Sequence, residues 1–223
     1  MNAFLEISHC VIGRKEALIQ SFSNIVESGN VVILTGKNGS GKSTLLKTIA
    51  GLILPISGQI KYNNQSIHAF TFAERAKLIA FVNTHKLSDE YIKVIDLVTL
   101  GRYPFNEKYK HSEITEKALA TLGISHLANK YINEISDGEF QKANIARALA
   151  QDTPIILLDE PSAFLDYPSK KELFFNLQNI AVEEHKIIIC PTHDIELSKT
   201  VGTLFWHLEN GIITETLEQI AWI

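Results

Sequence analysis

A glycine-rich segment limits the folds open to this chain more than any other feature. Residues Gly36–Thr44 read Gly-Lys-Asn-Gly-Ser-Gly-Lys-Ser-Thr, after the apolar run Val31–Leu34 and at the start of Ser43–Ala50, which has a helical pattern. Glycines lack a Cβ atom, so the backbone can curl and direct successive N–H groups at phosphate oxygens. The helix adds the positive end of its dipole. The segment therefore predicts a strand, a phosphate-binding loop and a helix within an α/β fold.

The same segment predicts how a nucleoside triphosphate is held. Lys42 is expected to reach the β- and γ-phosphates, and the Ser43 hydroxyl is expected to ligate Mg²⁺. A chance glycine-rich turn is the alternative, which the complete Gly-Lys-Ser-Thr ending between a strand and a helix disfavours. The candidate nucleotide contacts here are Gly36, Asn38, Gly39, Ser40, Gly41, Lys42, Ser43 and Thr44.

An acidic pair follows the most apolar run of the chain. Ile155–Leu158 is continuously apolar, as expected of a strand buried on both faces of a parallel sheet. Asp159 and Glu160 come at its carboxyl end, where open α/β sheets bind ligands. Asp159 can then hold Mg²⁺, and Glu160 can polarise an attacking water. A solvated acidic pair is the alternative, and the phosphate loop in the same chain favours the catalytic interpretation.

A histidine follows the next predicted strand. His193 comes shortly after the apolar run Ile187–Cys190, one strand beyond the acidic pair. A single histidine is more often structural than functional. Its position at the end of the neighbouring strand nevertheless favours a place near the γ-phosphate, and we take His193 as a second catalytic candidate.

Composition excludes several classes of protein. The 223 residues carry a formal net charge of −4, which gives no basic field for nucleic acid. Cys10 and Cys190 lack metal-ligand spacing and are expected to be buried thiols in a reducing compartment. The N-terminus lacks the pattern of a secretion signal, and the apolar runs are too short to span a bilayer. We expect a cytoplasmic protein that meets a membrane only through a partner.

The remaining patterns predict an α/β core interrupted by helices. Strands are expected over 4–7, 18–22, 31–34, 79–82, 155–158, 187–190, 203–207 and 212–214, a hairpin over 59–67, and helices over 94–100, 114–122, 139–150, 169–183 and 195–201. From about 85 to 135 only helical periodicity occurs. We interpret that stretch as a helical subdomain inserted in a core that spans 1–223.

These residues together resemble the ATP-binding-cassette ATPases. Ser136-Asp137-Gly138-Glu139, after Ile135, is similar to the family signature Leu-Ser-Gly-Gly-Gln, with Asp137 for the first glycine and Glu139 for the glutamine. The resemblance implies a P-loop NTPase core with a mostly parallel sheet, an N-terminal antiparallel β-subdomain and the helical insertion. It also implies that Ser136, Gly138 and Glu139 face the γ-phosphate held by another subunit. A capped helix start is the alternative for this short stretch.

Three further stretches match the family. Ser162–Asp166 resembles the D-loop that crosses the dimer interface, which implies a nucleotide-site role for Asp166. Val94–Pro104 and Ala148–Pro154 resemble the branch that serves iron-siderophore, haem and cobalamin importers.

Two further positions depart from the family pattern. Thr84 stands where a glutamine usually touches Mg²⁺ and the γ-phosphate, and its hydroxyl is expected to bind the metal or a metal-bound water, with a shorter reach. Val11, between Cys10 and Ile12, stands in the region where an aromatic residue usually stacks on adenine. Apolar contact from Val11 is the expected substitute.

The resemblance implies an ATPase subunit that uses ATP and Mg²⁺ to energise an importer. Its expected partners are a second copy or a paired cassette subunit and an integral membrane permease, so that the chain is peripheral on the inner face of the cell membrane. It contacts neither nucleic acid nor the transported substrate. The alternatives are a soluble cassette ATPase unconnected to transport and a nucleotide-binding regulatory subunit with little turnover.

Overall fold

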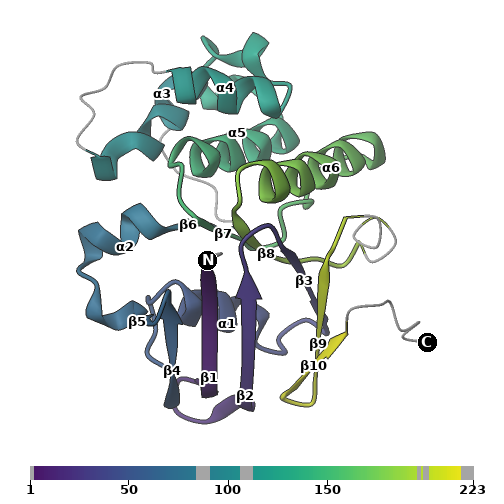
Figure 1. Ribbon diagram of the computed structural model, residues 1–223. Coiled ribbons are helices and arrows are strands. Elements are labelled where there is room, and N and C mark those ends of the chain that lie inside the picture. Colours follow the sequence, from purple (N-terminus) through teal and green to yellow (C-terminus); the bar gives the residue numbers. More distant parts are fainter. Residues whose placement is uncertain (1–2, 84–90, 106–112, 195–196, 198–200, 217–223) are drawn as a thin grey trace.

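The computed structural model describes residues 3–83, 91–105, 113–194, 197 and 201–216, which contain two β-sheets (Figure 1). The smaller sheet is antiparallel, in the order β2–β1–β4–β5. Its strands are β1 (Phe4–Gly13), β2 (Ala17–Glu27), β4 (Ser57–Tyr62) and β5 (Gln65–Ser66). The predicted N-terminal antiparallel sheet is therefore confirmed.

The larger sheet has the order β10–β9–β3–β8–β7–β6, and only the β9–β10 pair is antiparallel. Its strands are β3 (Val31–Gly36), β6 (Ile79–Val82), β7 (Ile155–Leu158), β8 (Ile187–Pro191), β9 (Leu204–Glu209) and β10 (Ile212–Thr216). The α/β class with a mostly parallel sheet is confirmed.

Strands of this sheet separate two hydrophobic cores, which explains their continuous apolar runs. Ile156 and Leu158 belong to one core, and their neighbours Ile155 and Leu157 belong to the other. Side chains alternate between the two faces of a strand, so a strand covered on both faces needs an apolar residue at every position. In Figure 1, helices cover one face, and α1 with the antiparallel sheet covers the other.

The helices flank this arrangement. They are α1 (Lys42–Ile49), α2 (Phe72–Leu78), α3 (Val94–Thr99), α4 (Glu113–Thr121), α5 (Asp137–Ala150) and α6 (Tyr167–Glu183). The predicted helix 195–201 lies mostly outside the described residues. The bounds of the helical insertion, about 85–135, stay a prediction because residues 84–90 and 106–112 also lie outside them. Within the described ranges, every helix is too short or too polar to cross a bilayer.

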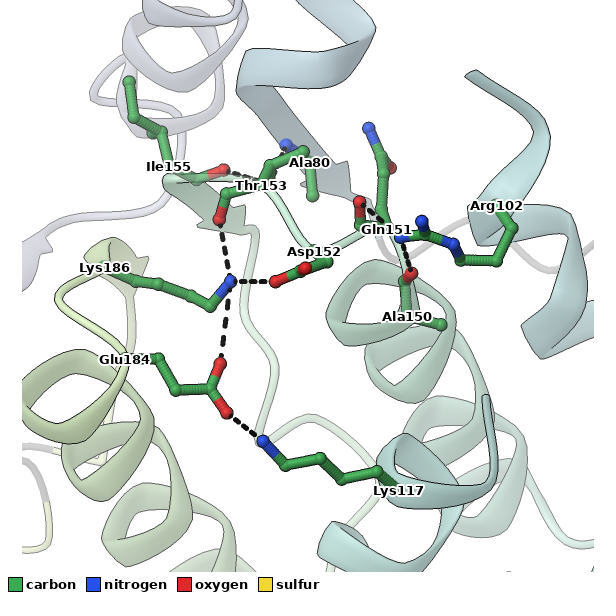
Figure 2. Close-up of polar contacts among 10 residues, drawn as sticks. All are labelled: Ala80, Arg102, Lys117, Ala150, Gln151, Asp152, Thr153, Ile155, Glu184 and Lys186. Carbon is green, nitrogen blue, oxygen red and sulfur yellow. Dashed lines mark hydrogen bonds and ion pairs between the residues drawn. The ribbon is translucent and has the colours of Figure 1, made fainter. Parts of the chain in front are cut away.

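A charged network joins α4 to the sheet core (Figure 2). The Lys186 ammonium, whose side chain is only 7% exposed, lies 2.7 Å from Asp152 Oδ1 and 3.5 Å from Glu184 Oε2. It also donates a hydrogen bond to Thr153 O at 3.2 Å. Glu184 in turn pairs with Lys117 of α4 at 2.6 Å. The buried ammonium of Lys186 is thus neutralised by two carboxylates, and the Glu184 carboxylate also forms an ion pair with α4.

The two stretches that resemble the importer branch contact each other. Arg102 Nη1 donates hydrogen bonds to Ala150 O at 3.0 Å and to Gln151 O at 3.4 Å, at the end of α5 (Figure 2). The Gln151 amide donates to Ala76 O and Ile79 O, at 2.6 and 3.1 Å. These stretches therefore form one structural unit that connects α5, the segment after α3 and the start of β6.

Candidate functional site

The phosphate loop connects β3 to α1 and depends on its glycines at two points. Gly36 has φ 148°, and a Cβ atom there would lie 2.4 Å from Leu208 O of the neighbouring strand. Gly41 has φ 113° immediately before α1. Residues with a side chain rarely adopt such positive φ values, so both positions favour glycine. The loop and its helix form as the sequence predicts.

Lys42 is folded onto its own loop. Its ammonium donates hydrogen bonds to Gly36 O at 2.8 Å and to Lys37 O at 3.1 Å, and the residue is only 6% exposed. Burial lowers the pKa of Lys42, although the negative charges of Glu160 and Asp159 oppose the shift. The cation is therefore available at the centre of the loop, where phosphate oxygens can replace the two carbonyl acceptors.

The two predicted metal ligands with described positions lie together. Asp159 is 8% exposed, and its backbone N–H donates to Val82 O at 2.9 Å. Burial raises the pKa of Asp159, and a hydrogen bond from the Ser43 hydroxyl opposes that shift. Carboxylate and hydroxyl oxygens are suitable Mg²⁺ ligands. The Ser40 hydroxyl is buried with no hydrogen-bond partner among the described residues, which also fits a polar ligand in the loop. Thr84 lies outside the described residues.

The two predicted catalytic residues also lie together. His193 Nε2 is 3.3 Å from Glu160 Oε1, and the two side chains are 49% and 38% exposed. Glu160 has φ 49°, a left-handed conformation that is uncommon for a residue with a side chain. Backbone outliers of this kind cluster at functional sites. The strand end therefore presents a solvent-accessible carboxylate beside an imidazole.

A cavity of about 360 Å³ opens between the loop and His193. Gly36 and Asn38 line it from the loop, and His207 and Glu209 line it from β9. His207 Nδ1 lies 2.9 Å from the Thr35 hydroxyl. Sequence reasoning missed His207 because it is far from the loop in the chain, and only the pairing of β9 with β3 brings it near.

A second cavity, of about 490 Å³, lies at the start of α5. Ser136, Gly138 and Glu139 line it together with Phe164 and Asp166 of the segment before α6. This segment packs closely on α5, since a Cβ atom on Gly138 would lie 2.8 Å from Phe164 O. The signature-like and D-loop-like stretches thus form one surface.

Both helix starts at this cavity are capped. Ser136 and Glu139 form a capping box: the Glu139 carboxylate accepts from the Ser136 N–H and hydroxyl at 2.8 and 2.9 Å, and the Glu139 N–H donates to Ser136 Oγ at 3.3 Å. These bonds, led by the one from the Ser136 N–H, lower the pKa of Glu139. Asp166 caps α6 and accepts from the Ser169 N–H at 3.0 Å. The capped-start interpretation is therefore confirmed, and a nucleotide-site role for these residues stays a prediction.

The predicted adenine contact lies in the antiparallel sheet. Val11 of β1 pairs with Ser57 of β4, and its carbonyl accepts from the Ile56 N–H at 2.8 Å. Apolar atoms of Leu18 and Ile19 on β2 lie 3.4 and 3.5 Å from the point where a Cβ on Gly41 would lie. These β2 residues are the apolar contacts that the structure brings to the loop, and the role of Val11 stays a prediction.

Known proteins share this sequence and fold. The model of the ABC transporter family matches residues 19–163. The petrobactin import ATP-binding protein FpuD of Bacillus anthracis is 34% identical over 204 residues, which cover 89% of this chain and 75% of that protein. The probable siderophore transport system ATP-binding protein YusV of Bacillus subtilis is 33% identical over 193 residues, which cover 84% of this chain and 70% of that protein.

A dimeric ATP-binding cassette bound to ADP and Pi has the same fold, with a TM-score of 0.85 and 23% identity. The match covers 97% of this chain and 99% of that chain. The chain therefore belongs to the ABC transporter family and is an ATPase domain of that family.

Proposed function

We propose that this ATPase domain energises a membrane importer of metal chelates such as iron-siderophores. The relatives named for petrobactin import and siderophore transport support the substrate class. The branch is supported by Val94–Pro104 and Ala148–Pro154, which resemble the siderophore, haem and cobalamin importers and are joined by the hydrogen bond from Arg102 to Ala150 O. The chain has a net charge of −4, so nucleic acid is a poor partner. In this proposal the chain lies on the cytoplasmic face of the membrane, bound to a permease that alone contacts the substrate.

The proposed chemistry follows from the positions of five side chains. The loop N–H groups and Lys42 bind the triphosphate, and Ser43 and Asp159 would hold Mg²⁺, which would neutralise charge on the phosphate oxygens. Glu160 orients and polarises a water for attack on the γ-phosphorus, which releases ADP and inorganic phosphate. His193, 3.3 Å from Glu160, hydrogen-bonds to the γ-phosphate and keeps the carboxylate in place.

One observation supports pairing of two chains. The cavity at the phosphate loop and the cavity at the start of α5 share no lining residue. Each chain then offers two halves of a nucleotide site: a loop half-site at the phosphate loop and a helix half-site at the start of α5. A head-to-tail pair of chains would join the loop half-site of each copy to the helix half-site of the other. In such a pair Ser136, Gly138 and Asp166 of one copy would face the nucleotide on the loop of the other.

Mixing two inactive variants tests this pairing. Lys42→Ala removes the loop half-site, and Gly138→Asp places a charge and a side chain in the helix half-site. Each variant alone should lack ATPase activity. A 1:1 mixture should recover about a quarter of the parental activity, because half of randomly formed two-fold pairs are mixed and each mixed pair holds one intact site.

The same assay carries its own control. Mixing two preparations of Lys42→Ala should give no recovery. Activity of the 1:1 mixture that equals the average of the separate preparations would contradict a site shared between two chains.

Uptake by intact cells tests the importer role. Deletion of the gene is expected to abolish uptake of radioactive iron supplied as a siderophore complex, and the parental gene should restore it. The Glu160→Gln gene, which encodes a nucleotide-binding chain without turnover, should fail to restore uptake. Unchanged uptake of siderophore iron, haem and cobalamin in the deletion strain would favour a cassette ATPase unconnected to this transport.

A further inference from the structure

A cluster of polar side chains surrounds the residue that follows His193 in the chain. Asp194, the next residue, accepts a hydrogen bond from the Ser162 hydroxyl at 2.5 Å and another from the Lys170 ammonium at 2.9 Å. Its own N–H donates to the Thr192 hydroxyl at 3.0 Å. Asp194 is thus held by three polar groups, one residue after the histidine whose imidazole contacts Glu160.

Both donors to Asp194 belong to the segment that carries the D-loop-like stretch. Ser162 is the first residue of that stretch, and Lys170 lies in the first turn of α6 just after it, where its N–H donates to Asp166 O at 2.9 Å. Phe164 of the same segment packs against Gly138 at the start of α5. A displacement of this segment is therefore transmitted to Asp194 at two points.

The Lys170–Asp194 contact is well placed to transmit such a displacement. The two side chains are 25% and 27% exposed, so water screens their attraction less than it screens a pair on the open surface. Burial raises the pKa of Asp194, but the hydrogen bonds from Ser162 and Lys170 outweigh it, and the pKa lies below its usual value. The ionised carboxylate is thus the stable form, and it keeps both donors.

We propose that Lys170 is a positioning residue which, through Asp194, fixes His193 against Glu160 and couples that geometry to the D-loop-like segment. The proposal rests on the hydrolytic roles proposed for Glu160 and His193. Lys170 acts on the arrangement of the catalytic pair and has no share in binding the nucleotide. Its loss should therefore slow turnover and leave nucleotide affinity unchanged.

Steady-state ATP hydrolysis tests this role with Lys170→Met. We expect kcat to fall about 10- to 100-fold, because a misplacement of about 1 Å at a reacting group can cost about 100-fold in rate. The KM for ATP should stay within about twofold of the parental value. Lys170→Arg, which keeps the charge, should recover most of the loss. Lys171→Met, which removes a charge from the adjacent exposed position, should match the parent.

A double variant separates positioning from general stability. If Lys170 acts through Asp194, then Lys170→Met combined with Asp194→Asn should be no slower than Asp194→Asn alone, since contacting residues that act as one unit are not additive. Losses that multiply, or a parental kcat in Lys170→Met, would overturn the proposal. Lys170→Gln serves in the same tests if the methionine variant does not fold.

Glu160→Gln distinguishes the two levels of the proposal. If Glu160→Gln hydrolyses ATP at the parental rate, the proposed hydrolytic site is wrong. If Glu160→Gln is inactive while Lys170→Met has parental kcat, only the role of Lys170 is wrong.

Discussion

Replacing Glu160 with glutamine is expected to lower kcat for ATP hydrolysis at least about 100-fold, the size of effect expected for loss of a general base. The amide has nearly the same shape as the carboxylate, but it carries no negative charge to polarise water. Nucleotide binding should survive because Lys42 and the loop are unchanged. The variant should therefore accumulate as an ATP-bound pair, seen by light scattering as twice the 24.9 kDa mass of one chain.

The matched control is Glu116→Gln, which makes the same chemical change at an exposed position of α4. This variant should hydrolyse ATP at the parental rate and show no trapped pair. Turnover of Glu160→Gln within about threefold of the parent would contradict the role of Glu160, because a general base contributes far more than that.

Replacing Lys42 with alanine is expected to weaken ATP binding about 100-fold or more. The variant loses one charge-assisted hydrogen bond to the β-phosphate and one to the γ-phosphate, and such bonds contribute about 1.5–3 kcal/mol each. In the structure the ammonium is held by Gly36 O and Lys37 O, so it is already placed at the centre of the loop. Calorimetric titration with ATP measures the change in Kd directly.

Two controls show whether the loss of ATP affinity comes from the missing Lys42 side chain in the phosphate loop. Lys171→Ala removes one positive charge from an exposed site on α6 and should keep the parental Kd. The melting temperature of Lys42→Ala reveals whether the freed carbonyls disturb the fold. Parental ATP affinity in a folded Lys42→Ala variant would refute the assignment of the phosphate loop.

Features with a single local cause were predictable from the sequence. The run Ile155–Leu158 must be apolar at every position because both faces of β7 are covered, and the strand has the predicted bounds. The positions of Asp159 and Glu160 at its carboxyl end follow from that strand alone. Ser43 and Asp159, more than a hundred residues apart, meet because parallel strands end at the same edge of a sheet.

Features without an apolar pattern were missed. The helix α2 (Phe72–Leu78) contains no buried residue, so its sequence lacks a detectable hydrophobic periodicity. The capping box of Thr71 and Glu74 is its one local signal. The strand β1 was predicted to end at Ile7, but it continues to Gly13. A left-handed residue, His9, interrupts it with a bulge, so that the buried positions change from odd to even numbers.

Side-chain clusters that join distant segments and match no known motif could not be predicted from the sequence. Asp194 meets Ser162 and Lys170 from 32 and 24 positions away, and no spacing rule links three such residues. The contact of Thr35 with His207 depends likewise on the register of β3 against β9. Such clusters follow from the assembled sheet.

The ion pairs between α4 and the sheet core differ in how strongly dissolved salt weakens them. The outer pair includes Lys117, whose side chain is 70% exposed, so mobile ions at physiological concentration, with a screening length of about 8 Å, weaken its attraction to Glu184. The inner cation, on Lys186, is shielded from those ions. Added salt therefore weakens the contact of α4 with Glu184, while the contacts of Lys186 with Asp152 and Thr153 stay intact.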